Sequence, residues 1–264
     1  MGRRVTRHVS LSGNYQIQKI KLFDVQIAEK DKPFVDRLFP QVLLSSFSSS
    51  AILDTRNDQL NPSAGRYASA NAQVAARAIG SEVGFVRSYF TAQLFRTLPH
   101  SRGTVLAASA RIGLAAGFPR PGGKNDQGIP ITIRELPASE RFFAGGDTTV
   151  RGFALDQLGI PNKTLDQNDF PIGGNGLLIF NAELRAPLRG NIGVVGFLDA
   201  GNVFAQTSDI DLGQLRSAVG FGVRYKSPIG PIRVDLGFKV HREDLATGLR
   251  ESLMALHISL GQAF

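Results

Sequence analysis

Residues 217–240, SAVGFGVRYKSPIGPIRVDLGFKV, decide the fold class of this 264-residue chain. Two runs of alternating apolar and polar side chains flank the turn sequence SPIGP. In the second run the apolar positions are Ile232, Val234, Leu236, Phe238 and Val240. The positions between them are Arg233, Asp235, Gly237 and Lys239. A period of two residues is typical of strands with one apolar and one polar face, and so short a turn predicts that the two strands pair antiparallel.

The same alternation recurs along the chain and predicts about ten strands. We expect them at 4–22, 40–54, 66–80, 84–97, 104–118, 176–188, 192–204, 215–227, 231–240 and 255–264. Most are long enough for a tilted strand that crosses a membrane, which needs about 9–11 residues. Short turns alternate with mostly longer connections, at 23–39, 119–175, 205–214 and 241–254, and this layout is typical of an outer-membrane barrel. No helix is expected.

The two faces of the strands differ in a way that favours a membrane barrel. The polar faces carry charges together with glycines and small residues, as a lumen would, whereas the apolar faces carry hardly a charge. A soluble β-sandwich also alternates, but its outer face would carry more Lys, Glu and Thr. On the last strand Leu256, Ile258, Leu260 and Phe264 share one face, so we expect the terminal aromatic on the lipid side, at the membrane interface. These patterns predict an all-β, antiparallel transmembrane β-barrel.

The composition argues against several other classes of protein. The net charge of +8 comes from basic residues spread singly along most of the chain, which argues against binding to nucleic acid. Without cysteine there can be no disulfide scaffold and no Cys-based zinc site. The four histidines lack ligand spacing, and no catalytic or nucleotide-binding motif occurs. We therefore expect no metal, no cofactor and no enzymatic activity, and interpret His257 as an inward-facing polar residue of the last strand.

Five motifs follow one another in the second half of the chain: GGDTTVRGF, FNAELRAPL, GFLDAGNVF, SAVGFGVRYKSPIGPIRVDLGF and HISLGQAF. Together, in this order, they resemble the C-terminal barrel of the BamA/TamA/Sam-type outer-membrane assembly family, the bacterial surface antigen superfamily. The stretch ILDTRNDQLNPSAG, at 52–65, is similar to a strand and turn of the same barrels.

The resemblance implies a barrel of a probable sixteen strands, of which about ten are present. The five strands after the Arg-Gly-Phe loop match the family, so the missing strands would be N-terminal ones. The sequence shows neither a POTRA domain nor a signal peptide, and we expect residues 1–264 to be the C-terminal barrel portion of a longer protein. The rival interpretation is a complete ten-stranded barrel, since ten strands can also close.

The resemblance also implies that the long loop at 119–175 folds into the lumen, where its Arg151 meets Glu183 and Asp199 on neighbouring strands. Alternation independently places both carboxylates on the lumen face, and an arginine can form forked bonds with such groups. Gly152 would let the loop backbone approach the barrel wall, and Phe153 would wedge against it.

The remaining candidate residues are assigned by their motifs. Phe197 and Gly201 belong to the strand motif GFLDAGNVF, and Gly261 and Phe264 belong to the last strand. That strand resembles the C-terminal signal by which barrel proteins are themselves recognised.

The function implied by the resemblance is that of an outer-membrane β-barrel that assembles or inserts other outer-membrane proteins, or translocates polypeptide. A lateral seam between the first and last strands, together with the lumen loop, would carry this activity in a Gram-negative bacterium or an organelle derived from one. The expected partners are outer-membrane lipid, unfolded outer-membrane or exported polypeptides, and accessory periplasmic or lipoprotein subunits. Two alternatives stay open: a two-partner-type secretion pore, and a passive channel or surface antigen.

Overall fold

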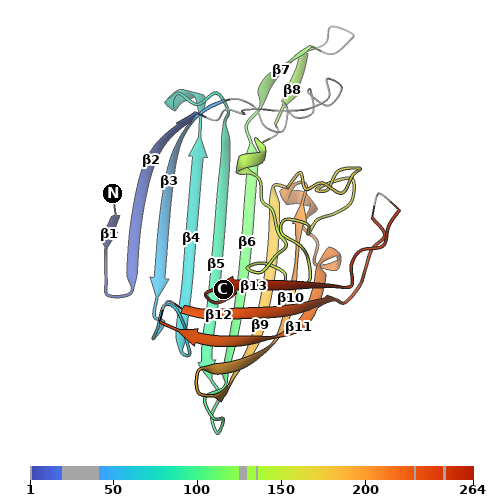
Figure 1. Cartoon of the computed structure of the whole chain (residues 1–264). Coiled ribbons are helices and arrows are strands. Elements are labelled where there is room, and N and C mark those ends of the chain that lie inside the picture. Colours follow the sequence, from blue (N-terminus) through green and yellow to red (C-terminus); the bar gives the residue numbers. More distant parts are fainter. Residues whose placement is uncertain (1, 20–41, 125–129, 135, 229, 246–247) are drawn as a thin grey trace.

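The computed structural model describes residues 2–19, 42–124, 130–134, 136–228, 230–245 and 248–264. Its main element is one antiparallel sheet of eleven strands, in the order β1-β2-β3-β4-β5-β6-β9-β10-β11-β12-β13 (Figure 1). The strands before the long loop are β1 (Gly2–Arg4), β2 (Val9–Lys19), β3 (Leu43–Asp54), β4 (Gly65–Ala75), β5 (Phe85–Thr97) and β6 (Val105–Gly117). Those after it are β9 (Gly176–Arg189), β10 (Ile192–Phe204), β11 (Arg216–Ser227), β12 (Gly230–Lys239) and β13 (Met254–Leu260).

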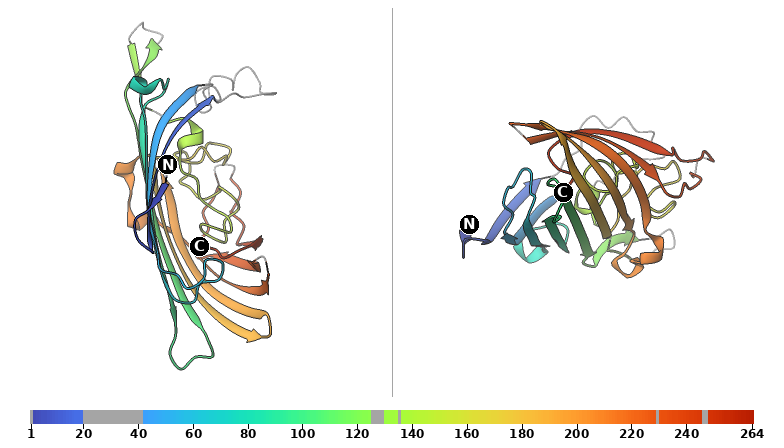
Figure 2. Two further views of the ribbon diagram at one scale, coloured as in Figure 1. Left: turned by 90° about the vertical axis from the view of Figure 1, so that its left-hand side faces the viewer. Right: turned by 90° about the horizontal axis from the view of Figure 1, so that it is seen from below.

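The sheet is coiled into an open segment of barrel wall. Figure 2 shows that it curls in one direction and that a long irregular loop lies on its concave side. Within the described residues β1 and β13 pair only with β2 and β12, so the sheet does not close as a ten-stranded barrel. The predicted all-β antiparallel fold is confirmed, as part of a barrel wall.

The distribution of side chains is inverted relative to a soluble protein. Leu94, Leu184, Leu198, Phe221 and Ile258 are among many large apolar side chains that lie exposed on the convex face. The concave face instead buries charged and polar groups, which include Ser109, Arg111, Asn181, Glu183, Arg185, Asp199, Arg224, Arg233 and Asp235. An apolar outside and a polar inside are what a barrel needs when lipid surrounds it.

Helical structure is limited to four short 3₁₀ turns in the described part of the chain: Arg77–Ile79, Ala138–Glu140, Thr207–Asp209 and Leu212–Gln214. No helix among the described residues combines the length and apolar character needed to cross a membrane. A small apolar core lies where the long loop meets the concave face near the long-loop rim. It contains Val83, Phe85, Leu136, Phe142, Val150, Phe153, Leu158, Leu177, Ile179 and Val203.

The predicted first strand, 4–22, is wrong as a single element. The chain instead forms the short strand β1, turns at residues 5–8 and continues as β2. The Thr6 hydroxyl accepts the backbone N–H groups of His8 and Val9, at 3.3 and 3.1 Å, and such a side-chain bond stabilises a turn. This division accounts for eleven strands where we expected about ten. Residues 20–22 and 40–41, and the loop predicted at 23–39, lie outside the described residues.

The loop predicted at 119–175 does not lie inside the barrel segment over its full length. Its first part forms the two-stranded hairpin β7 (Arg120–Lys124) and β8 (Pro130–Ile133), which projects beyond the rim of the sheet (Figures 1 and 2). The part that follows, residues 136–175, lies on the concave side, and we call it the inner loop.

Phe264 does not occupy the predicted lipid-facing position. Strand β13 ends at Leu260, and Gly261, at φ +96°, turns the chain away from the strand direction. The Gln262 amide then donates to Asn61 Oδ1 over 2.8 Å. As a result the Phe264 ring stacks on buried Phe95 at a centroid distance of 6.3 Å, on the inner side. Alternation extends only as far as the strand, and the left-handed glycine ends it.

Candidate functional site

The candidate site is the contact between the inner loop and the concave face of β9–β13. The tip of the loop, residues 145–153, is held as a compact turn by its own hydrogen bonds. Gly145 N–H donates to Thr149 Oγ1 over 2.8 Å, and Gly146 N–H donates to the Phe153 carbonyl over 3.0 Å. Both glycines have positive φ angles, which a residue with a side chain rarely adopts. The turn therefore presents Arg151 to the sheet in a fixed direction.

Arg151 is the centre of the site and is only 1% exposed. Its Nε and Nη2 donate to the two carboxylate oxygens of Asp199 over 2.7 and 2.9 Å, and its backbone N–H donates to the same group over 3.0 Å. Three bonds from one residue to one carboxylate fix both its backbone and its guanidinium. A forked arginine–carboxylate pair is among the strongest polar contacts available in a buried site.

Two further carboxylates complete the surroundings of Arg151. Its Nη1 donates to Glu183 Oε1 and lies 3.4 Å from Asp235 Oδ2. Arg185 Nε donates to Glu183 Oε2 over 2.6 Å, and Arg224 bridges Glu183 and Asp235. Cations and carboxylates thus alternate through the buried cluster. Removing one partner from such a cluster costs about 3–5 kcal/mol, because the charges left behind stay buried without a counter-ion.

The register of the sheet brings together the wall residues that contact the Arg151 guanidinium. Glu183, Phe197, Gly220 and Gly237 lie in one row across β9, β10, β11 and β12. The Phe197 ring leans over Gly220, where a Cβ would approach the ring to 2.4 Å. The Arg151 guanidinium lies 3.6 Å from the centre of that ring. Because Gly220 has no side chain, the Phe197 ring can lie over it and present its face to the guanidinium. Cation–π attraction between this ring and Arg151 then adds to the ion pairs of Arg151.

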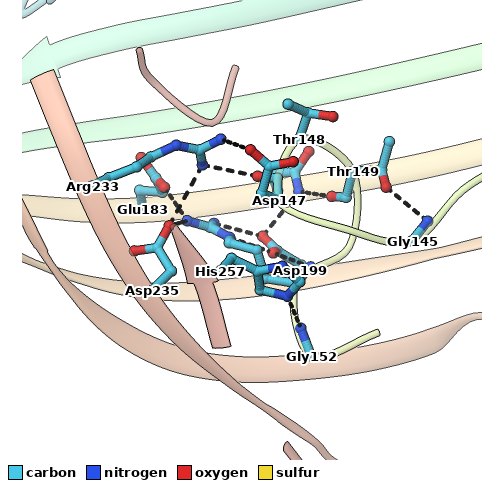
Figure 3. A network of polar contacts seen from close by, with 12 residues as sticks. Gly145, Asp147, Thr148, Thr149, Gly152, Glu183, Asp199, Arg233, Asp235 and His257 are labelled. Atoms are coloured by element: carbon cyan, nitrogen blue, oxygen red, sulfur yellow. Dashed lines mark hydrogen bonds and ion pairs between the residues drawn. The ribbon is translucent and has the colours of Figure 1, made fainter. Parts of the chain in front are cut away.

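A second set of bonds also attaches the loop tip to the wall, and Figure 3 shows its pair of Arg233 with Asp147. Arg233 donates to the Asp147 carboxylate over 2.6 Å and to its carbonyl over 2.8 Å. Arg111 donates to the Thr148 carbonyl and Asn181 to the Thr149 carbonyl, both over 2.6 Å. The backbone carbonyls of the tip are thereby satisfied by inward-facing side chains of β6, β9 and β12.

The loop also touches the last strand. Gly152 N–H donates to His257 Nε2 over 3.3 Å, as Figure 3 shows. Phe153, which follows, is 1% exposed, and Arg216 and Lys239 place their charged groups 4.7 and 4.8 Å from its ring centre. Gly152 and Phe153 therefore contact three neighbouring strands, β11, β12 and β13, in addition to the strands that Arg151 binds.

Sequence analysis identified part of this arrangement. The structure brings Arg151 together with Glu183, Asp199 and Phe197, and it places Gly201 on the same face, where a Cβ would lie 3.1 Å from Val150 Cγ2. Gly261 and Phe264 belong to the C-terminal tail and do not contact Arg151, but the Phe264 ring centre lies 5.4 Å from the guanidinium of Arg185. The analysis missed Asp235 as a third carboxylate and Arg233–Asp147 as a second tether. Alternation had placed Asp235 and Arg233 on the polar face, but nothing local indicated which loop residues they meet.

The described residues contain no group of three or more His, Cys, Asp or Glu side chains arranged to hold a metal ion. The arrangement is suited to holding a peptide loop rigidly against a wall, since the ion pairs, hydrogen bonds and ring contacts join groups of the protein itself.

Comparison with known proteins assigns the architecture. The sequence matches the Omp85 superfamily domain over residues 1–264. The chain belongs to the Omp85 superfamily. Membership confirms the predicted resemblance to the BamA/TamA/Sam-type barrels, and with it a location in the outer membrane of a Gram-negative bacterium or of an organelle derived from one.

Relatives of this Omp85 chain occur in bacteria and in eukaryotes. It is 30% identical over 170 residues to sorting and assembly machinery component 50 homolog A of Xenopus laevis, covering 61% of this chain and 32% of that protein. It is 29% identical over 231 residues to the outer membrane protein assembly factor BamA of Neorickettsia risticii, covering 84% of this chain and 28% of that protein. The chain thus spans about a third of the length of the relatives it matches.

A solved structure shows the same fold. The crystal structure of BamA from Haemophilus ducreyi lacking POTRA domains 1–3 superposes with a TM-score of 0.70 and 20% sequence identity. The match covers 98% of this Omp85 chain and 53% of that chain. Nearly all of the open sheet described above therefore corresponds to a part of that protein.

Proposed function

We propose that this Omp85 barrel segment takes part in the assembly of other outer-membrane proteins, with the inner loop as an internal support for the strands next to the sheet edge. The proposed role is mechanical and involves no enzymatic chemistry. The observation that carries the proposal is the attachment of the loop by Arg151 to three carboxylates on β9, β10 and β12. The names of the relatives in two kingdoms, which refer to assembly, support it.

The position of the loop suits such a support. Strand β13 pairs with β12 on one side, and within the described residues its other edge has no partner. Unpaired strand edges are able to accept an incoming strand by main-chain hydrogen bonding. The inner loop holds β12 through Arg233 and contacts β13 through His257, so it would keep this edge in position while a new strand pairs with it.

The decisive experiment replaces Arg151 by Ala in the native gene and measures the amounts of folded outer-membrane proteins in the cells. We expect those amounts to fall, while the Arg151→Ala protein itself is still present in the membrane. Arg96→Ala is the matched control, because Arg96 is exposed, near the end of β5, and separated from β9 by β6 in the sheet.

Normal levels of folded outer-membrane proteins in Arg151→Ala cells would refute the proposal, provided the variant accumulates normally. Loss of one exported protein with all other barrels unchanged would favour a secretion pore instead. Steady ion conductance without any effect on other barrels would favour a passive channel.

A further inference from the structure

A second site lies at the rim formed by the short turns, on the opposite side of the ion-pair cluster from the inner loop. A cavity of about 330 Å³ opens there. One side of it is the barrel wall, from β9 to β12 and the β5–β6 turn, and the other side is made by residues 61–63 and Gln262. The bond between Gln262 and Asn61 ties the C-terminal tail to the β3–β4 turn across this cavity.

The charges around this cavity are of one sign. Arg102, Arg185, Arg224 and Lys226 line it, and the described lining residues include no Asp or Glu. The charge of Arg224 is balanced by its ion pair with Asp235, and the charge of Arg185 is balanced by the bond from its Nε to Glu183. The other two cations, Arg102 and Lys226, are exposed and form no ion pair with any described residue.

Arg185 is unusual in its unused hydrogen-bonding capacity. It is only 8% exposed, yet both Nη1 and Nη2 are buried and lack a partner. No other side chain in the described part of the chain has two such atoms. The guanidinium is held 5.6 Å from the ring centre of Phe95 and 5.4 Å from that of Phe264, so its position is fixed. Buried donors without acceptors are costly, and the paired Nη atoms match a planar oxyanion.

We propose that this cavity binds a carboxylate of a polypeptide that reaches the short-turn rim, with Arg185 as its forked donor. The cavity is too large for a bare ion, and its remaining wall includes Val105, Val195 and Pro187, which suit the carbon atoms next to a carboxylate. Lipid contacts the opposite, apolar face of these strands. That the carboxylate belongs to a polypeptide rests on the proposed function, whereas the oxyanion site does not.

The electrostatics of the rim favour an acidic partner. Arg7, Arg102, Arg189 and Lys226 lie exposed on or beside its turns. The acidic residues on the described parts of these turns are Asp54 and Asp58, and both are already engaged. Asp54 pairs with Arg56, and Asp58 accepts the N–H groups of Leu60 and Asn61. A positive rim attracts negatively charged segments and raises their rate of association.

The experiment measures binding of fluorescent hexapeptides to the full-length protein in detergent by anisotropy. One peptide carries a single internal Asp and an amidated end, a second has a free C-terminal carboxylate and no acidic side chain, and a third is neutral and amidated. We expect one or both acidic peptides to bind at least about tenfold more tightly than the neutral one, since charge-assisted bonds are lost with the carboxylate. Which of the two binds identifies a side chain or a chain end as the source.

Two variants test the residues. Arg185→Lys keeps the charge but loses the fork, and we expect binding about tenfold weaker. The double substitution R102Q/K226Q leaves the Arg185–Glu183 bond intact and should weaken binding severalfold and reduce its dependence on salt. Arg96→Gln is the control, because Arg96 is exposed and does not line the cavity, and this variant should bind as the unmodified protein does.

Equal binding of all three peptides, or unchanged binding by R102Q/K226Q, would overturn the proposal. Binding of inorganic phosphate to the cavity, with no binding of either acidic peptide, would also overturn the proposal. Because peptide binding is measured without any assembly step, lost assembly with intact binding would count against the proposed function alone. Intact assembly without peptide binding would count against this inference alone.

Discussion

Gly152 of the inner loop and Gly237 of β12 are in direct backbone contact. A Cβ on Gly237 would lie 2.5 Å from the Gly152 nitrogen and 2.8 Å from the carbonyl carbon of Arg151. Gly152 has φ +95°, and a Cβ there would lie 2.9 Å from Ala218 Cβ. The loop backbone thus lies closer to β12 than a side chain at either glycine would allow. At this separation the Arg151 guanidinium reaches the carboxylates on the wall.

We predict that Gly237→Ala loosens the inner loop. The added methyl group overlaps backbone atoms that have no rotamer to relieve the contact, and overpacking of this kind costs about 1–3 kcal/mol. The expected result is faster cleavage of the loop by added protease and a lower midpoint of unfolding. Gly196→Ala is the control, because no atom lies within 4 Å of the Cβ it would add. Equal behaviour of the two variants would show that the backbone contact has no energetic importance.

Asp147→Asn should weaken the second tether by a smaller amount than the loss of Arg151. The variant removes the ion pair with Arg233 but leaves the 2.8 Å bond from Arg233 to the Asp147 carbonyl. The Asp147 side chain is 30% exposed, so water screens the pair and we expect a loss of about 1 kcal/mol. Asp156→Asn serves as the control on the same loop, since Asp156 forms no ion pair with described residues. A larger loss of unfolding free energy in Asp156→Asn than in Asp147→Asn would contradict the role of Asp147 as a tether.

Lysine at Val234 should destabilise the protein in lipid. Val234 is 41% exposed on the convex face in the middle of β12, and a lysine at mid-depth costs about 2–4 kcal/mol. Val240→Lys, just beyond the end of the same strand, should cost about 0–1 kcal/mol, because it lies near the interface. Unfolding in lipid vesicles measures both. Equal costs at the two positions would mean that the strand does not cross the membrane as described.

The connection before β13 should be sensitive to acid. Burial alone would raise the pKa of the Glu251 carboxyl, but the bonds that it accepts from Arg216 and the Glu243 amide hold this pKa below its ordinary value. The folded state therefore favours the ionised carboxylate. Its contribution to stability is complete above the unfolded pKa of about 4.3 and is lost as the pH falls through the lower, folded value.

Hydrogen exchange of the Glu243 amide, which donates to Glu251 Oε2 over 3.1 Å, reports this change. We expect protection that is constant at neutral pH and falls under acid conditions, after correction for the intrinsic exchange rate. In Glu251→Gln the protection should be weak and independent of pH. A pH profile that is the same in both proteins would exclude Glu251 as its origin.

The sequence alone determined the strands and their faces. Alternation with a period of two is a local property, so it predicted the strand positions closely for β5, β6, β9, β10, β11 and β12. It also placed Glu183 and Asp199 on the inner side. Local rules failed where a side chain or a glycine ended the repeat, as at Thr6 in the first hairpin and Gly261 before Phe264.

Only the tertiary structure decided which inward-facing groups meet. Arg151 and Asp235 are 84 positions apart, and their contact depends on the register of β10, β11 and β12 as well as the path of the loop. Four arginines, Arg151, Arg185, Arg224 and Arg233, form ion pairs with four carboxylates around the loop tip. Many other pairings of these groups are conceivable, and sequence spacing does not choose among them. Charge-assisted hydrogen bonds need donor and acceptor atoms within about 3 Å of each other. The strand register, which sets the side chains that are neighbours across the sheet, and the backbone contact of Gly152 with Gly237 therefore select the pairs that form.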